Sequence, residues 1–336
     1  MRQNNIFLML LKVFFFSSIL VATSAVRAEL KVVTTIKPLH SLIANVMDGV
    51  GEPALIIEGS TSPHSFTLKP SHAKLLEEAD IIFWVGESIE TFMERPLESI
   101  VKNAEVVEFM EVESINKLKF REESIFEDHD DHDDHDDHDD HDDHDDHDDH
   151  DDHDDHDDHS GHDHHGHAHG EFDAHIWLDP MNAKEMVHEI AHELGDLDPA
   201  NKNKYEANAQ ATIQALDQLV NDIEKGINKD AKFVVFHDAY QYFEERFETR
   251  AAGALTLNTD VLPGAKQIAD IQDVIKDRGI KCIFSEPQFN PKIITTIAED
   301  MNIKTGVFDP LGANIDSNKE LYFKLIQNLG NELKGC

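Results

Sequence analysis

Residues 198–229 have the sequence DPANKNKYEANAQATIQALDQLVNDIEKGINK. Apolar side chains recur every three or four positions along this stretch, which places them on one face of a helix. These residues are Tyr205, Ala209, Ile213, Leu216, Val220, Ile223 and Ile227. At about 1.5 Å per residue, such a helix would be more than about 30 Å long. We therefore predict a connecting helix over residues 198–229 that joins two domains and limits their movement.

Short apolar segments alternate with helical segments on both sides of this helix. Before it, strands are expected at 30–36, 54–57 and 80–85, with helices at 38–47 and 70–78. After it, strands are expected at 232–236, 254–257, 281–284 and 305–308, with helices between them and a last helix at 318–333. Buried strands that alternate with helices favour parallel sheets covered on both faces. The second half of the chain therefore repeats the architecture of the first.

The predicted fold is α/β, with two parallel-sheet domains bridged by one long helix. Residues 29–127 form the N-terminal domain, and residues 170–197 return to it. Residues 230–336 form the C-terminal domain. Because ligands of such sheets bind beyond the carboxyl ends of the strands, we expect the site in the cleft between the domains.

The first 28 residues have the pattern of a secretion signal. Arg2 and Lys12 flank or interrupt an apolar stretch over residues 6–21, and small residues lead to Ala28, after which we expect cleavage. A membrane anchor is the alternative, but the stretch is short for a bilayer span of about 20 apolar residues. We therefore predict a periplasmic protein without stable membrane insertion.

Only two cysteines occur, Cys282 and Cys336, and neither stands at the predicted cleavage site, where a lipid-modified receptor would need one. An exported protein meets an oxidising compartment, and an even number of cysteines is typical of paired thiols there. We therefore expect a disulfide between Cys282 and Cys336.

Residues 128–169 form an insert of extreme composition. From Asp130 to His159 the tripeptide Asp-Asp-His occurs ten times in succession, and a second histidine-rich tract follows. The insert holds 22 aspartates and 16 histidines and no Lys or Arg, so it supplies much of the net charge of −39. With almost no apolar side chain it cannot form a core, and we expect disorder. The histidines favour weak, multiple zinc binding over the role of a passive linker.

The charge of the chain also excludes one class of partner. No basic patch or arginine-rich segment is present to neutralise phosphates, so nucleic-acid binding is not expected.

Seven histidines lie outside the insert, and three of them stand in loops or at strand ends: His64 after Pro63, His175 before a turn, and His237 at the end of an apolar strand. Asp309 similarly ends the strand that precedes Pro310. A single histidine of this kind is more often a hydrogen-bonded residue than a metal ligand. Four such residues from both halves could nevertheless converge on one ion.

Five segments around these residues resemble the zinc-receptor (ZnuA) branch of the metal-binding receptors of ABC importers. In chain order they are PHSFTLKPS at 63–71, HIWLDP at 175–180, FHDAYQYF at 236–243, SEPQF at 285–289 and DPLG at 309–312. The resemblance covers essentially the whole mature chain, including the histidine-rich insert and the two cysteines.

The resemblance implies that His64, His175 and His237 bind zinc, with Asp309 as a fourth ligand or as a carboxylate beside a bound water. Three imidazoles and one oxygen suit tetrahedral Zn²⁺. The manganese and iron branches, an alternative of similar fold, carry a carboxylate where His237 stands. Some zinc receptors have an acidic residue just before the first ligand, but here that residue is Pro63. We interpret Glu286 as a loop residue that supports the second domain, since a proline follows it.

The segment HEIAH at 188–192 matches the zinc-protease signature His-Glu-x-x-His, with Glu189 as the general base if the match were functional. However, Val187, Ile190, Ala191 and Leu194 would form the buried face of this helix, which leaves both histidines on its flank. No methionine that could form a metzincin turn follows before Met301.

We therefore predict a receptor that delivers zinc to a membrane permease and is not an enzyme, because four protein ligands leave no dependable open position for a substrate. We expect it to be a monomer. A histidine-rich zinc store, in which the insert rather than the cleft binds the metal, remains as a further alternative.

Overall fold

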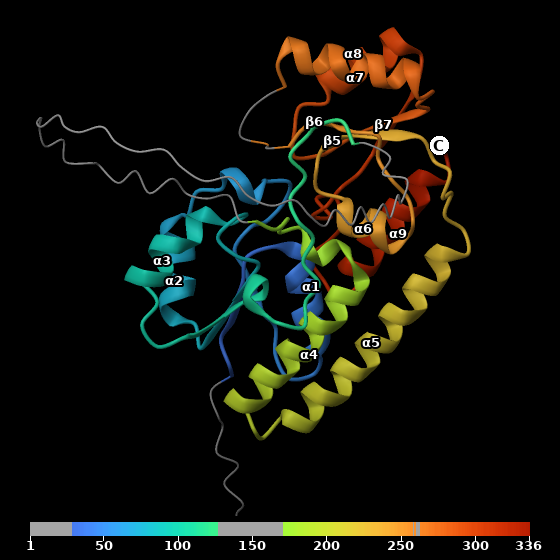
Figure 1. Ribbon diagram of the computed structural model, residues 1–336. Coiled ribbons are helices and arrows are strands. Elements are labelled where there is room, and N and C mark those ends of the chain that lie inside the picture. Colours follow the sequence, from blue (N-terminus) through green and yellow to red (C-terminus); the bar gives the residue numbers. More distant parts are fainter. Residues whose placement is uncertain (1–28, 127–170, 258, 260–262) are drawn as a thin grey trace, which may run out of the picture.

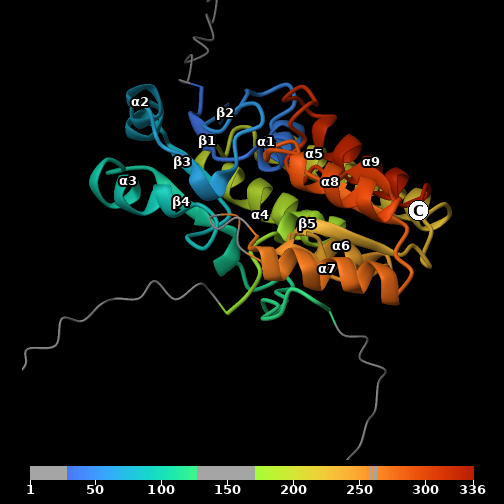
Figure 2. The same ribbon diagram turned by 90° about the horizontal axis from the view of Figure 1, so that it is seen from above.

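The computed structural model describes residues 29–126, 171–257, 259 and 263–336. The predicted signal peptide at 1–28 and the predicted insert at 128–169 lie outside the described residues. Two parallel sheets of four strands each, with helices around them, make up the rest (Figure 1). In both views the two sheets lie in different halves of the molecule (Figure 1 and Figure 2).

The N-terminal sheet has the strand order β2-β1-β3-β4. Its strands are β1 (Val32–Thr34), β2 (Ala54–Leu55), β3 (Ile81–Trp84) and β4 (Glu105–Glu108). The helices of this part are α1 (Lys37–Val46), α2 (Pro70–Glu78) and α3 (Glu94–Ser99), and short 3-10 turns occur at Pro63–Ser65, Thr91–Met93 and Phe109–Glu111. The central strands β1 and β3 are buried throughout, as their continuous apolar sequences require.

The C-terminal sheet has the equivalent order, β6-β5-β7-β8. Its strands are β5 (Phe233–His237), β6 (Ala254–Thr256), β7 (Cys282–Ser285) and β8 (Lys304–Val307). Its helices are α6 (Gln241–Arg246), α7 (Ala265–Asp277), α8 (Lys292–Met301) and α9 (Leu321–Leu333). In each sheet the chain moves outward to one side and then crosses to the other, and a ligand is expected beyond the carboxyl ends of the two central strands of such a sheet.

This topology confirms the predicted α/β fold of two parallel-sheet domains, and the second sheet repeats the first. Most predicted elements are present with ends shifted by a few residues, and the predicted helix at 70–78 has the bounds of α2. Strand β4 was not expected from the sequence. It lies at a sheet edge, and Val107 is its only buried residue, so it lacks the apolar run that marks a central strand.

Helix α4 (Pro180–Leu197) and helix α5 (Lys202–Glu224) pack against each other along the molecule (Figure 1). Helix α5 is shorter at both ends than the connecting helix predicted over residues 198–229. At its start, Asp198 and Asn201 form a turn that precedes the helix. Its 23 residues are about 34 Å long. Helix α5 contacts α1 beside the N-terminal sheet and α9 beside the C-terminal sheet, so it does brace the two domains.

The segment before the insert also joins the domains, and we call residues 118–126 the strap. Lys119 pairs antiparallel with Phe172, and Ile125 pairs antiparallel with Gly253, next to β6. The strap, green in Figure 1, reaches up to β6 from the N-terminal half. Arg121 in its middle forms ion pairs with Asp238 at 2.9 Å and with Glu244 at 2.7 Å.

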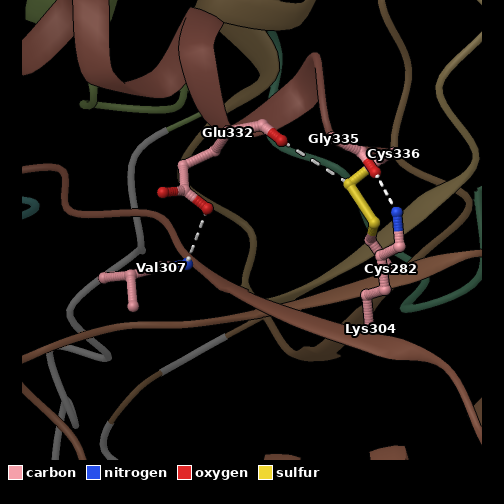
Figure 3. Close-up of a disulfide and its surroundings, with 6 residues drawn as sticks. All are labelled: Cys282, Lys304, Val307, Glu332, Gly335 and Cys336. Carbon is pink, nitrogen blue, oxygen red and sulfur yellow. Dashed lines mark hydrogen bonds between the residues drawn. A yellow bond between two sulfur atoms is a disulfide. The ribbon is translucent and has the colours of Figure 1, made fainter.

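Cys282 and Cys336 form a disulfide, with Cα atoms 5.8 Å apart (Figure 3). The prediction of this pair is confirmed. The bond ties the C-terminal end of the chain to β7, and Lys304 Nζ donates a hydrogen bond to Gly335 O beside it.

One further property concerns membranes. Within the residues that the structure describes, no helix has both the length and the apolar character needed to span a bilayer.

Candidate metal centre

Three predicted ligands, His64, His175 and His237, come together at one point. His64 lies in the 3-10 turn Pro63–Ser65, in the loop between β2 and α2. His175 precedes the 3-10 turn Ile176–Leu178, which leads into α4. His237 is the last residue of β5. One ligand nitrogen of each lies within 4.8 Å of those of the other two, and among the described residues no other group of His, Cys, Asp and Glu is so arranged.

The three imidazole rings enclose a small space. Their ring centroids are 5.6 Å apart for His64 and His175, 5.5 Å for His64 and His237, and 4.9 Å for His175 and His237. The cavity between them has a volume of about 10 Å³, room for one water or one ion. It is also lined by Ser62, Pro63, Trp177, Glu286, Gln288, Phe289, Pro310 and Leu311.

This arrangement fits a tetrahedral zinc ion. Three nitrogens at about 2.0 Å from one zinc would lie about 3.3 Å from one another. Nitrogens that are now within 4.8 Å would therefore need to move together by no more than about 1.5 Å.

Two of the three histidines, His175 and His237, have a carboxylate next to Nδ1 of the ring. Asp173 Oδ1 lies 2.7 Å from Nδ1 of His175, and both residues are buried. The carboxylate oxygens of Glu286 lie 3.2 and 3.3 Å from Nδ1 of His237, and this pair is buried too. A carboxylate at Nδ1 fixes the ring and leaves Nε2 with its lone pair free, an arrangement that most metal-binding histidines have.

The register of the C-terminal sheet explains why Glu286 meets His237. Val235 of β5 is paired with Phe284 of β7 in the parallel ladder. Two residues further along both strands, His237 and Glu286 therefore stand beside each other at the carboxyl end of the sheet. The interpretation of Glu286 as a loop residue that supports the second domain is thus incomplete, because its carboxylate also contacts a predicted metal ligand.

His64 differs from the other two histidines. Its Nε2 is buried and has no hydrogen-bond partner among the described residues, which is costly for a polar atom unless a ligand binds there. Burial, together with the neighbouring His237 and His175, holds the pKa of His64 well below its ordinary value, so the ring is neutral at pH 7. A neutral imidazole is the form that binds a metal.

The pKa of His237 is shifted the other way. Burial has the largest effect and lowers it, but the carboxylates of Glu286, Asp238 and Asp173 together outweigh burial, so the pKa lies above its ordinary value. Any metal bound by His237 therefore competes with a proton that Glu286 stabilises.

The structure does not bring Asp309 into the group of three ligand nitrogens. Its carboxylate instead accepts hydrogen bonds from the backbone N–H groups of Leu311 at 3.2 Å and Ala313 at 2.6 Å. It also accepts a hydrogen bond from Gln288 Nε2 at 3.0 Å. The role of Asp309 as a ligand, or as a carboxylate beside a water, stays a prediction.

The histidines of the protease-like segment lie elsewhere. In α4 the side chains of Val187, Ile190, Ala191 and Leu194 are buried, as expected, whereas His188 is exposed and the side chain of His192 is 63% exposed. His192 interacts with Glu193 and Asp196 on its own helix. Among the described residues no third ligand approaches this pair.

Sequence reasoning missed the roles of Asp173, Glu286 and Gln288. Asp173 stands two residues before His175 and Glu286 follows directly after a buried strand, so both had a recognisable signal: a carboxylate next to a predicted ligand or at a strand end. Gln288 had no comparable signal, since a neutral amide in a loop is common.

Comparison with known proteins places the chain in a family. The family model for "Zinc-uptake complex component A periplasmic" (ZnuA) matches residues 32–336. The high-affinity zinc uptake system protein ZnuA of Brucella abortus is 50% identical over 307 residues, which cover 91% of each chain. The protein of the same name from Yersinia pestis is 31% identical over 322 residues, which cover 95% of each chain.

Solved structures agree on the fold. A crystal structure of ZnuA has a TM-score of 0.68 at 20% identity, covering 90% of this chain and 98% of that one. The solute-binding protein FpvC of Pseudomonas aeruginosa in complex with Mn²⁺ has a TM-score of 0.69 at 20% identity, covering 91% and 99%. From the family match and these long, similar relatives it follows that the chain belongs to the ZnuA family of periplasmic zinc-uptake components.

Proposed function

We propose that this chain is the periplasmic receptor of an ABC-type importer, which captures one Zn²⁺ in the cleft between its domains and delivers it to a membrane permease. The observation that carries this proposal is the convergence of His64, His175 and His237 on one cavity of the size of an ion. These residues reach it from the N-terminal loop after β2, the entry to α4 and the end of β5. The names of its relatives, such as the Brucella zinc uptake protein, point the same way.

We propose His64, His175 and His237 as the three protein ligands, with the fourth position open to a water close to Asp309 and its partner Gln288. Zinc accepts such a shell readily, whereas manganese prefers several oxygen ligands in octahedral geometry. The two buried carboxylates nearest the rings, Asp173 and Glu286, bond to Nδ1 atoms. Three nitrogen ligands therefore favour zinc over the manganese or iron of the alternative receptor branch.

The chain performs capture and release without chemistry on the ion. The carboxylates of Asp173 and Glu286 orient two rings before the ion arrives, which reduces the entropy lost on binding. The fully buried Trp177 contributes to the wall of the cavity, which excludes bulk water and strengthens the interaction between ion and ligands. We propose no catalytic reaction for this site.

We propose that the protein acts in the periplasm together with a membrane permease. Export with cleavage after Ala28 would release a monomer into the periplasm, where the pair Cys282–Cys336 is oxidised. The partner is the permease of a zinc importer.

Metal analysis of purified protein tests the proposal. After dialysis against a weak chelator, the protein should retain about one zinc through the cleft site. His64→Ala or His237→Ala should lose most of it, because each removes one of three protein ligands. The matched control is His188→Ala, which removes an exposed histidine from α4 and should retain the zinc. Full retention in both cleft variants would contradict the assignment.

The same samples separate the receptor from a zinc protease. Glu189→Gln, which removes the base of the protease-like segment, should leave zinc binding unchanged, and no zinc-dependent cleavage of unstructured peptides is expected. Peptide cleavage that Glu189→Gln abolishes would establish an enzyme instead.

A further inference from the structure

Gln288 lies in the loop after β7 and lines the cavity between the three histidines. Its side-chain oxygen, Oε1, is buried and has no hydrogen-bond partner among the described residues. A buried acceptor left without a donor costs about 1–3 kcal/mol. Because Gln288 lines the binding cavity, a group bound there can supply the missing donor.

The orientation of the amide follows from its neighbour. Gln288 Nε2 lies 3.0 Å from Oδ1 of Asp309, and an ionised carboxylate can only accept hydrogen bonds. The NH₂ end of the amide must therefore face Asp309, which leaves Oε1 as the end without a partner. If the amide were turned round, two acceptors would face each other at this distance.

Asp309 in turn is held by its own loop. Its oxygens accept from the N–H groups of Leu311 and Ala313, so its position is fixed by backbone rather than by a metal. The loop after β8 therefore fixes Asp309, and Asp309 fixes the amide of Gln288, whose Oε1 has no partner among the described residues.

We propose that Gln288 Oε1 accepts a hydrogen bond from the water that fills the fourth position of the bound zinc, and that Asp309 is a positioning residue for Gln288. A zinc-bound water is a strong donor, because the ion draws electron density from it. An amide oxygen accepts this bond without adding a negative charge to the site. Three imidazoles and one water then bind the ion, and no carboxylate contacts it directly. This set of ligands favours zinc over metals that prefer oxygen ligands, such as manganese.

This inference rests on the proposed zinc site, and two measurements on intact protein test it. The zinc affinity is measured by competition with a chromophoric chelator, and the visible spectrum of the Co²⁺-loaded protein reports the geometry of the shell. Gln288→Leu should weaken zinc binding by about tenfold, as is typical when a group that supports a metal shell is removed. It should also change the Co²⁺ bands. Gln288→Met, a more flexible replacement of similar length, is measured beside it in case the leucine variant misfolds.

A double-mutant cycle shows whether Asp309 positions Gln288 or binds the zinc itself. If it acts through Gln288, Asp309→Leu, which removes the acceptor of the Gln288 amide, should weaken binding by a similar factor, and the double variant should bind no more weakly than the weaker single variant. Gln218→Leu, in an exposed position on α5, is the control and should change neither readout. Unchanged zinc affinity and Co²⁺ bands in folded Gln288 variants would overturn the proposal. Additive losses would also overturn it, since they would make Asp309 a ligand in its own right.

The histidine variants distinguish a failure of the proposed zinc site from a failure of the proposed role of Gln288. If His64→Ala binds zinc as tightly as the unmodified protein, the cleft site itself is wrong, whatever Gln288 does. If His64→Ala loses zinc and the Gln288 variants do not, the site stands and only the role of Gln288 is refuted.

Discussion

Replacing Glu286 by glutamine removes the charge behind His237 and keeps the size of the side chain. The amide oxygen of the new residue can still accept a hydrogen bond from His237 Nδ1, so the ring should stay in place. The imidazole becomes a weaker base, because its pKa loses the raising effect of Glu286 and should fall, with Asp238 and Asp173 still acting against burial.

The loss of zinc affinity should be large at high pH. The side chains of His237 and Glu286 are only 4% and 1% exposed, so solvent screens their interaction little. Removing a group that supports a metal ligand typically weakens binding by about 10- to 100-fold. This burial places Glu286→Gln in the upper part of that range, which corresponds to about 2–2.7 kcal/mol.

The loss should also shrink as the pH falls. In the unmodified protein the pKa of His237 is raised, so a proton starts to compete with zinc above pH 6.5, and the affinity then falls by up to about tenfold per pH unit. In Glu286→Gln the lowered pKa delays this competition to a lower pH. The two proteins should therefore differ most near pH 8 and less near pH 6.

Competition titrations with a chromophoric chelator at pH 8, 7 and 6 measure this ratio. Glu90→Gln is a matched control, because Glu90 is also buried but accepts hydrogen bonds from Val85 and Gly86 in the N-terminal domain. It should leave zinc affinity unchanged. A ratio that stays the same at all three pH values, or grows as the pH falls, would refute the link between Glu286 and the proton on His237.

Three further outcomes are expected. Replacing both Cys282 and Cys336 by serine opens a link over 54 positions and should lower the free energy of unfolding by about 4 kcal/mol, measured with denaturant; a change below about 1 kcal/mol would contradict it. Arg121→Met leaves two buried carboxylates without their cation and should lower the free energy of unfolding by about 3 kcal/mol, measured by thermal denaturation. An unchanged melting midpoint would show that the strap does not stabilise the contact between the domains. Deleting residues 128–169 should leave one tight zinc in calorimetric titration while weaker events vanish; loss of the tight event would favour the zinc store.

The fold was accessible from the sequence because its central strands are continuous apolar runs. Strand β5, with the sequence FVVFH, is buried at every position, and such runs between helices favour one architecture. Strand β4 was not accessible for the opposite reason: an edge strand with one buried residue has no pattern that distinguishes it from a loop. The ends of the connecting helix were also misplaced, because Ile227 continues the apolar spacing after the helix has ended.

From the sequence, the site residues could be predicted only where they lie at the end of a strand or helix. His237 ends a strand, and strand ends meet at one edge of a parallel sheet. The partnership of His237 with Glu286 depends on the register between β5 and β7, which no segment contains by itself. The hydrogen bonds of Asp309 depend on how one loop folds back on itself, so the sequence alone could not distinguish a ligand from a residue that positions its neighbour.

Buried contacts join the two domains, so a large hinge movement during metal loading would be costly. Buried Lys37, at the start of α1, donates hydrogen bonds to Gly312 O and Ile315 O, both at 2.6 Å, in the loop of the C-terminal domain that carries Asp309. Trp177 Nε1 donates to Pro310 O at 2.8 Å in the same loop. One apolar core includes residues of both sheets and of α4 and α5. Opening the cleft widely would expose this core and break these bonds together.

The ligands themselves differ in how firmly they are held. His175 and His237 are fixed by carboxylates, whereas no carboxylate of the described part of the chain bonds to His64, in the loop that follows the short strand β2. Phe66 in this loop packs on Phe92 and on His72, so a small movement there would shift His64 without opening the core. Capture and release should therefore depend on the His64 loop moving against two fixed rings. Stiffening that loop should slow zinc exchange more than it changes zinc affinity, since affinity depends on the end states and the rate on the path between them.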